Sequence, residues 1–249
     1  MTATAPSGSS SLDQPDYWWY RARADLLKAA LQPYLGEPTL VLDVGSADGP
    51  SISWMQGRGR RVALDMNPRG LTPGVSVCAS VLALPFRDGA FDVVAAFDVI
   101  EHCEPEKQAM TEMTRVLAPG GTMLLSTPAY QWAWTDHDVW AGHYRRYTRR
   151  QLISVVEAAG LDVVRSTYAF TSVFPFFVAE RAVRRLRRRK PDVRPRLTHT
   201  PPLVEKVLMA GTAADRRLLR KHDLPFGSSI FVAAVKRDSA ARMGDVRQG

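Results

Sequence analysis

A segment from residue 128 to residue 147 concentrates side chains that could bind a small molecule and remove a proton from it. It holds two histidines, His137 and His143, each close in sequence to a carboxylate or an arginine. An imidazole titrates near neutral pH and can therefore act as a general base. We predict that one of these two histidines is catalytic. The alternative is that they hydrogen-bond the loop backbone, which a loop of this length also needs.

The same segment offers groups that could contact an acceptor molecule. Tyr130 and Trp134 could form the walls of an apolar pocket, and Arg145 and Arg146 could bind an anion, so we predict substrate contacts from all four. Two structural alternatives stay open. The aromatic residues could simply pack the loop down, and the arginines could pair with aspartates of the loop.

A metal ion could be held by His137, Asp138 and His143. The two histidines are six residues apart, a spacing that matches no common metal motif, and no cysteine joins them. The sequence therefore predicts no metal site.

The segment LVLDVGSADGP, residues 40–50, is typical of a buried strand that runs into a glycine turn and the start of a helix. In such a turn, backbone N–H groups point at a ligand that approaches closely. Asp65 ends the next apolar run, twenty residues after Gly45, where a carboxylate would bind two ribose hydroxyls. The spacing predicts a nucleotide site. The alternative is an ordinary turn with an exposed aspartate.

This turn does not fit a dinucleotide. Its small residues are Gly45, Ala47 and Gly49, and the third glycine of the dinucleotide fingerprint, which allows close packing over a pyrophosphate, is missing. Asp43 and Asp48 flank the turn, where they would repel a diphosphate and suit a ligand that carries an ammonium and a sulfonium. The electrostatics favour S-adenosylmethionine over NAD.

The elements that must position these residues alternate along the chain, which predicts an α/β fold with a doubly wound, mostly parallel sheet. Strands are predicted at 39–44, 61–64, 75–79, 91–97, 122–127, 161–168 and 228–235, and helices at 17–35, 106–117, 149–159, 175–190 and 203–221. The last two helices form an insertion, at about 170–227, before the last strand. Because ligands of such sheets bind beyond the carboxyl ends of the strands, the segment 128–147 should lie beside the nucleotide turn.

Length and composition fit one domain: 249 residues, 45% hydrophobic and 23% charged, can bury a core. We predict a disordered leader over 1–16, a single domain over 17–237 and a flexible tail over 238–249. Two cysteines, Cys78 and Cys103, make no disulfide framework. No secretory signal and no apolar run long enough to span a bilayer are present, so a cytoplasmic location is expected.

The net charge of +8 is concentrated in one place. The range from Arg181 to Arg196 holds nine basic residues and one acid, an excess equal to the net charge of the whole chain. It follows an apolar stretch, Phe174 to Val178, in an order that resembles an interfacial membrane helix. We expect a peripheral contact with an anionic membrane or an anionic acceptor, with a solvated helix face as the alternative. A nucleic-acid site would spread its basic residues over a face of the fold.

Five stretches, in this order, resemble the class I S-adenosylmethionine-dependent methyltransferases of the type 11 group. They are VLDVGSADG (41–49), VALD (62–65), LPFRDGAFDVV (84–94), FDVIEHC (97–103) and RVLAPGGTMLLSTP (115–128). The resemblance covers about residues 40 to 128. It implies a Rossmann-like seven-stranded sheet in the order 3-2-1-4-5-7-6, with the seventh strand antiparallel, and an enzyme that uses S-adenosylmethionine as its methyl donor.

The resemblance also implies which residues hold the cofactor. Asp65 would bind the ribose and Met66 would lie against the adenine. Ser80 stands where the family usually has an aspartate for the adenine amino group, and Phe97 and Asp98 fall where the family contacts the cofactor after the fourth strand. The full implied set is Asp43, Gly45, Ser46, Ala47, Gly49, Asp65, Met66, Ser80, Val81, Phe97 and Asp98.

The acceptor is expected to be a small molecule with a hydroxyl, an amine or an acidic carbon. Methyltransferases of nucleic-acid base amines commonly carry an Asn/Asp/Ser-Pro-Pro-aromatic stretch after strand four, and this chain has Asp98-Val99-Ile100-Glu101 there. For His102 we expect a structural role, or a position adjacent to the cofactor, in preference to a catalytic role. A non-catalytic S-adenosylmethionine-binding scaffold or regulator is the alternative function. The titratable and aromatic residues of 128–147 favour catalysis.

Overall fold

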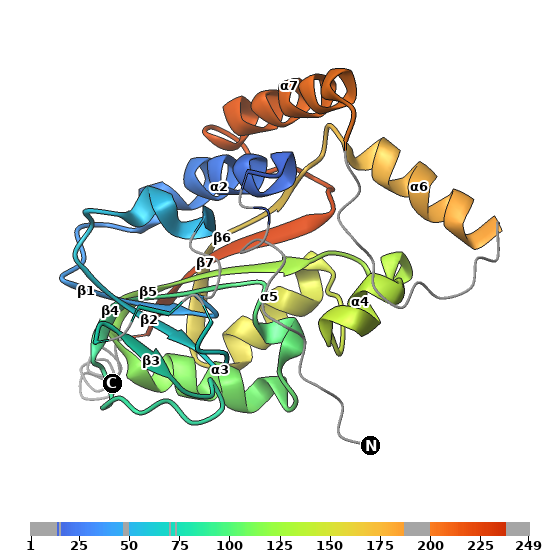
Figure 1. The fold of residues 1–249 in the computed structure, drawn as a ribbon. Helices are drawn as coiled ribbons and strands as arrows, with labels where there is room; N and C mark the ends of the chain where they lie inside the picture. Colours follow the sequence, from blue (N-terminus) through green and yellow to red (C-terminus); the bar gives the residue numbers. More distant parts are fainter. Residues whose placement is uncertain are drawn as a thin grey trace, which may run out of the picture.

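The computed structural model describes residues 14, 16–46, 50–69, 71–72, 74–186 and 200–237 (Figure 1). Its seven strands form one sheet in the order β3-β2-β1-β4-β5-β7-β6, which confirms the predicted fold class and strand order. β7 runs antiparallel to both β5 and β6, and the other neighbours are parallel. The strands are β1 (Leu40–Val44), β2 (Arg60–Asp65), β3 (Ser76–Cys78), β4 (Phe91–Phe97), β5 (Leu117–Pro128), β6 (Leu161–Ala169) and β7 (Ser229–Lys236).

The centre of the sheet is apolar on both faces. In β4 every residue except Asp92 is buried, and β7 is buried over its first six residues. Continuous apolar runs of this length are typical of parallel strands covered on both sides. This is why the strands could be placed from the sequence to within a few residues.

Helices cover the two faces of the sheet (Figure 1). α2 (Trp18–Leu31) and α7 (Pro202–Leu219) pack against each other on one face, and α3 (Glu106–Val116) and α5 (Arg149–Ala158) lie on the other. α2 buries Leu26, Leu27, Ala30 and Leu31, an apolar stripe at helical spacing. Short 3-10 helices follow α2, β1 and β4: η1 (Gln32–Tyr34), η2 (Pro50–Met55) and η3 (Ile100–His102).

The segment 128–147, predicted as a loop, contains a short 3-10 helix, η4 (Gln131–Ala133), and a helix, α4 (Asp136–Ala141). Thr135 and Asp138 form a capping box at the start of α4, and Gly142 ends it in a left-handed conformation with φ of +76°. Both features are sequence signals of helix ends. The prediction passed over them because only six residues separate them.

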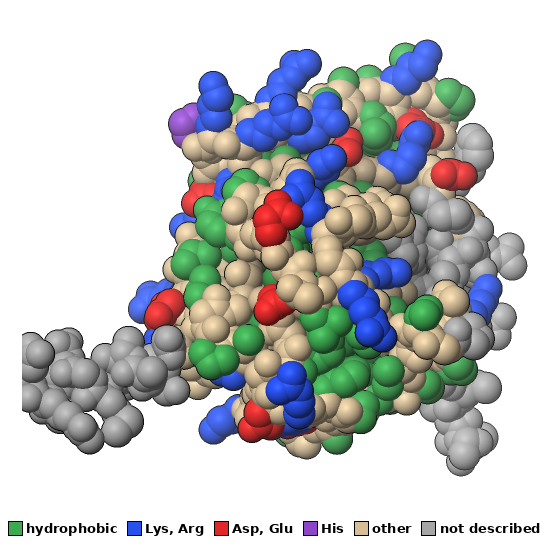
Figure 2. Space-filling model, turned by 90° about the vertical axis from the view of Figure 1, so that its left-hand side faces the viewer, with side chains coloured by type: hydrophobic (Ala, Val, Ile, Leu, Met, Phe, Trp, Pro, Cys, Tyr) green, Lys and Arg blue, Asp and Glu red, His purple; other side chains and the backbone are tan. Residues whose placement is uncertain are grey.

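The predicted insertion before the last strand is present as α6 (Phe174–Leu186) and α7 (Figure 1). α6 projects away from the sheet beside α4. Arg187 to Arg196, most of the predicted basic run, lies outside the described residues, as do most of the predicted leader (1–16) and the whole predicted tail (238–249). Figure 2 shows Lys and Arg gathered along the upper edge of one face, over α7, and both signs of charge mixed below.

The register of the sheet brings the ends of four strands into one row. Val44 pairs with Leu64 of β2 and with Ala96 of β4, and Phe97 pairs with Ser126 of β5. The residues that follow these positions therefore face the same edge of the sheet. The nucleotide turn, Asp65, Asp98 and the segment 128–147 meet there, as predicted for parallel strands.

Candidate active site

The turn after β1 requires a glycine for two reasons. Gly45 has a φ of +73°, which an L side chain rarely adopts, and a Cβ on it would lie 2.6 Å from Cγ2 of Val99. The backbone N–H groups of Gly45 and Ser46 donate to the carbonyl oxygen of Leu64 at 2.8 Å and 3.2 Å. The turn is thereby fastened to the end of β2, beside Asp65.

Asp43, on β1, is buried, and its Oδ2 pairs with Nη1 of Arg61 at 3.1 Å. The negative charge of Asp43, just before the turn, is therefore partly balanced by Arg61 of β2. Ala47 and Gly49, also predicted to hold the cofactor, lie outside the described residues.

Asp65 is fixed by the turn that follows β2. Its Oδ1 accepts the backbone N–H of Asn67 at 2.7 Å, and its backbone carbonyl accepts the N–H of Ala79 at 3.1 Å. The next residue, Met66, is 71% exposed. The chain thus has a carboxylate at the strand end with an exposed apolar side chain beside it, and their ribose and adenine contacts stay predictions.

The hydroxyl of Ser80 stabilises the loop in which it lies. Its Oγ accepts the N–H of Leu82 at 3.2 Å, which closes a local turn, and the neighbouring Val81 is buried. At the position of the family's usual aspartate the chain therefore offers a hydroxyl with a conformational role.

Asp98, directly after β4, is held by a buried arginine that the sequence analysis missed. Arg23 of α2 is 2% exposed; its Nη2 lies 2.8 Å from Oδ2 of Asp98 and donates to Oγ of Ser126 at 2.8 Å. Ser126 in turn donates to Oδ1 of Asp98 at 2.9 Å. The charge of Asp98 is therefore already balanced by Arg23, so a cationic group of a ligand would meet little net negative charge beside Asp98. The available signal was an arginine on the apolar stripe of a predicted helix.

Asp138 is the centre of the acceptor segment. It is fully buried and accepts hydrogen bonds from Nε and Nη2 of Arg146 at 2.7 Å and 3.0 Å, and from the backbone N–H of Thr135 at 2.8 Å. Its Oδ1 also lies 2.9 Å from Nδ1 of His143. Burial alone would raise its pKa, but the bonds from His143 and Arg146 hold the pKa of Asp138 well below its usual range. The group is therefore an anion at neutral pH.

His143 is oriented by that anion. An ionised carboxylate only accepts, so Nδ1 of His143 carries a hydrogen, and in the neutral ring Nε2 carries the lone pair. The ring lies against His102, with centroids 4.5 Å apart and planes at 85°. His137, the other predicted base, is half-buried on α4 beside Trp140; burial and the neighbouring His143 lower its pKa.

Glu101, on η3, lies beside the rings of His102 and His143 and is fully buried. Within the described part of the chain, neither of its carboxylate oxygens has a hydrogen-bond partner. Burial and the charge of Asp98 raise the pKa of Glu101 well above its usual range. Its backbone carbonyl accepts the N–H of Tyr144 at 2.8 Å, which joins η3 to the acceptor segment.

The aromatic residues of the segment pack mainly on one another. Tyr130 stacks on Trp132 and on Tyr168, with ring centroids 5.6 Å and 5.4 Å away, and α6 places Phe174 against the same group. Burial raises the pKa of the Tyr130 hydroxyl to about 12. Trp134 is half-buried. The packing alternative thus describes Tyr130, while substrate contacts by Tyr130 and Trp134 stay predictions.

Both predicted anion-binding arginines are engaged by acids. Arg146 is buried in its pair with Asp138, the ion-pair alternative that the sequence left open. Arg145 pairs with Glu104, and its Nη1 lies 3.0 Å from Oε2 of Glu106. An anionic acceptor would have to compete with these carboxylates, and the arginines' role in binding it stays a prediction.

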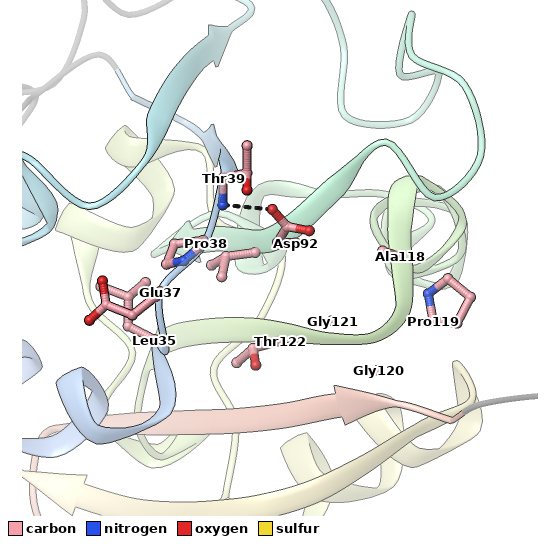
Figure 3. A pocket seen from close by; sticks show the side chains of 11 residues that line it. Leu35, Glu37, Pro38, Thr39, Asp92, Ala118, Pro119, Gly120, Gly121 and Thr122 are labelled. Atoms are coloured by element: carbon pink, nitrogen blue, oxygen red, sulfur yellow. Dashed lines mark hydrogen bonds between the residues drawn. The ribbon is translucent and has the colours of Figure 1, made fainter.

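A depression of about 310 Å³ lies at the opposite edge of the sheet (Figure 3). It is lined by the amino ends of β1, β4 and β5, where Oδ2 of Asp92 accepts the backbone N–H groups of Thr39 and Leu40 at 2.8 Å and 3.0 Å. Ligands of this kind of sheet bind at the carboxyl ends of the strands. The depression is therefore separate from the candidate active site.

Comparisons with known proteins agree with this geometry. Residues 42–125 match a family model described as a methyltransferase domain. An uncharacterized methyltransferase of Mycobacterium sp. (strain JLS) is 32% identical over 178 residues, which cover 61% of this chain and 70% of the relative.

Solved structures share the fold. The 1,6-didemethyltoxoflavin-N1-methyltransferase of Burkholderia thailandensis, solved with 1,6-didemethyltoxoflavin and S-adenosylhomocysteine, has a TM-score of 0.55 at 17% identity and covers 92% of this chain and 84% of its own. Phosphoethanolamine N-methyltransferase 2 of Haemonchus contortus, solved with S-adenosyl-L-methionine, has a TM-score of 0.54 at 16% identity and covers 92% and 60%. With the sheet order, the matched domain and the mycobacterial relative, these findings show that the chain belongs to the class I S-adenosylmethionine-dependent methyltransferases.

Proposed function

We propose that this enzyme methylates a small-molecule acceptor, with S-adenosylmethionine as the donor, and that the reacting group of the acceptor lies beside His143. The observation that supports the proposal is the buried Asp138–His143 pair at the carboxyl ends of β4 and β5. A carboxylate that fixes the tautomer of an imidazole is the arrangement of a positioned general base.

The residues present fit S-adenosylmethionine. Asp65 offers a carboxylate to the ribose hydroxyls at the end of β2, with Met66 exposed beside it. Gly45 allows the close backbone turn beside them. When bound, this cofactor supplies a methyl group that is already activated, so the protein must align the acceptor and remove a proton.

His143 is the histidine that we assign to proton removal. In the neutral ring its Nε2 holds the lone pair. The ring lies in a cluster with Glu101 and His102, and Glu101 follows Asp98, at the end of β4, by three residues. His137 lies on α4, which ends before His143, and is outside this cluster. The aromatic residues of the segment and of α6 pack on one another, and they offer apolar surface to an acceptor.

The proposal is tested by incubating the purified enzyme with labelled S-adenosylmethionine and fractions of a metabolite extract, then identifying the labelled product. His143→Gln should lower the rate on that product by about 100-fold, because a positioned base contributes this much, with cofactor affinity unchanged. His137→Gln should lower it less. His222→Gln removes an exposed histidine outside the acceptor segment and outside this cluster, and is the matched control.

Full activity of His143→Gln would contradict the assignment of the base. Binding of S-adenosylmethionine without transfer to any fraction would instead favour the scaffold or regulatory alternative.

A further inference from the structure

We propose that Glu101, His102 and His143 bind a divalent transition-metal cation at the acceptor end of the active site. One ligand atom from each side chain lies within 4.8 Å of the other two. The sequence analysis predicted no metal because it weighed His137, Asp138 and His143. The structure brings Glu101 and His102, from the end of β4, to His143 instead.

Glu101 provides the strongest argument. A fully buried carboxyl group with two unpartnered oxygens is costly, and native proteins leave few such groups unexplained. A cation between Glu101 and the two imidazoles would supply the missing partner.

The two histidines are prepared as ligands. Metal-bound histidines usually donate their second N–H to a carboxylate or a backbone carbonyl. Nδ1 of His143 donates to the buried Asp138 at 2.9 Å, which leaves Nε2 for the cation. The ring of His102 lies against that of His143, with centroids 4.5 Å apart, so the two imidazoles face one site.

The donor set selects the class of cation. Two imidazole nitrogens and one carboxylate oxygen suit Mn²⁺, Co²⁺ or Zn²⁺ better than Mg²⁺ or Ca²⁺, which prefer oxygen. Bonds of about 2.1 Å bring neighbouring ligand atoms to about 3–3.5 Å of each other, so the three side chains must close by up to about 1.5 Å. Three protein ligands leave at least one coordination position open to an acceptor, and His102 is exposed to solvent.

The cation would define the acceptor, a step that rests on the proposed function. An acceptor hydroxyl bound at an open position has a lowered pKa and loses its proton to solvent. Its oxygen then forms the bond to the methyl carbon as the carbon–sulfur bond breaks, with that electron pair staying on sulfur. With the cation bound, His143 is its ligand in place of acting as the direct base, and the acceptor is an alcohol or phenol.

The test is direct cation binding by tag-free, chelator-treated full-length protein. We expect one site for Mn²⁺, measured by electron paramagnetic resonance of the free ion, and for Co²⁺, measured by its visible absorption. Glu101→Gln and His143→Gln should each weaken binding by about 100-fold or more, and Asp138→Asn by about 10- to 100-fold. His222→Gln should bind as the wild type does, and circular dichroism of each metal-free variant reports whether it folds.

Wild-type protein that binds Mn²⁺, Co²⁺ and Zn²⁺ no more tightly than Glu101→Gln would overturn the site. If, in addition, methyl transfer continues in chelator, His143 remains the direct base and the proposed function stands. Cation binding without transfer to any acceptor would support the site and contradict the proposed function.

Discussion

At the scale of single residues, Asp65 is expected to decide cofactor affinity. Asp65→Ala should weaken S-adenosylmethionine binding at least tenfold by calorimetry. It removes two charge-assisted hydrogen bonds to the ribose, each worth about 1.5–3 kcal/mol. Asp162→Ala is the matched control, because Asp162 lies in an exposed pair with Arg237. Unchanged affinity in Asp65→Ala, or NADH binding as tight as S-adenosylmethionine binding, would contradict the assignment of this site.

Glu101 should make stability depend on pH. Its folded-state pKa is raised, so its contribution is fully present below the ordinary value of 4.5 and is lost as pH rises through the raised pKa. Glu101→Gln cannot ionise. In chelator, urea unfolding at several pH values between about 5 and 9 should therefore show the variant gaining on the wild type as pH rises. If the free energies of unfolding of Glu101→Gln and the wild type changed with pH in the same way, the raised pKa assigned to Glu101 would be contradicted.

The residues that sequence could identify are those whose role is local. Gly45 and Asp65 follow strand ends at a fixed spacing, so their place in a βα unit was visible without the fold. Arg23 and Glu101 were missed because their partners come from distant elements: Arg23 reaches Asp98 across 75 residues, and Glu101 meets His143 across 42. Local patterns carry no information about such pairings.

At the scale of elements, patterns of hydrophobicity predicted the strands and the long helices, since each buries a face that its period reveals. β5 illustrates the limit. The prediction started it at residue 122, but it begins at Leu117, because the Pro119-Gly120-Gly121 turn is incorporated at the amino end of the strand. Tertiary pairing with β4, which includes Phe91 with Leu117, overrides the local turn signal there.

Arg23 should couple α2 to the ends of β4 and β5. Arg23→Gln leaves Asp98 and Ser126 without a buried cationic partner, and we expect a loss of about 2 kcal/mol in the free energy of unfolding, measured in urea. Arg21→Gln on the same helix breaks only an exposed pair with Glu205 and should cost less than about 1 kcal/mol. Equal losses in the two variants would show that the buried pair has no special role.

At the scale of the whole molecule, the described helices include none that is long and apolar enough to cross a membrane. The predicted apolar stretch before the basic run divides into two parts. Phe174 and Phe177 face inward and lie 6.3 Å from the ring of Trp132, so they cover the acceptor segment. Arg181, counted with the basic run, also turns inward, over the ring of Phe177 at 4.6 Å. In the structure these three side chains therefore pack on the protein itself, and the membrane contact of the run stays a prediction.

What remains outward is still amphipathic. Phe176 and Leu186 of α6 are 62% and 83% exposed, and Leu203 at the start of α7 is 75% exposed. In the sequence Phe176 and Leu203 flank the rest of the basic run, Arg184 to Arg196, and Leu186 lies within it. An exposed apolar edge joined to positive charge is the composition of a surface that binds anionic lipid.

We therefore expect the protein to sediment with acidic vesicles at low salt and to leave them as salt rises. Each well-placed arginine contributes about 1 kcal/mol within a Debye length of such a surface.

Replacing Arg185, Arg188 and Arg189 with glutamine should abolish most of the binding and leave S-adenosylmethionine affinity unchanged. A control triple, Arg60, Arg87 and Lys107 to glutamine, removes the same net charge from exposed positions elsewhere and should keep binding. If wild-type protein ignores acidic vesicles, or both triples lose binding equally, the membrane contact is wrong. A raised acceptor KM in the first triple alone would then assign the run to an anionic acceptor.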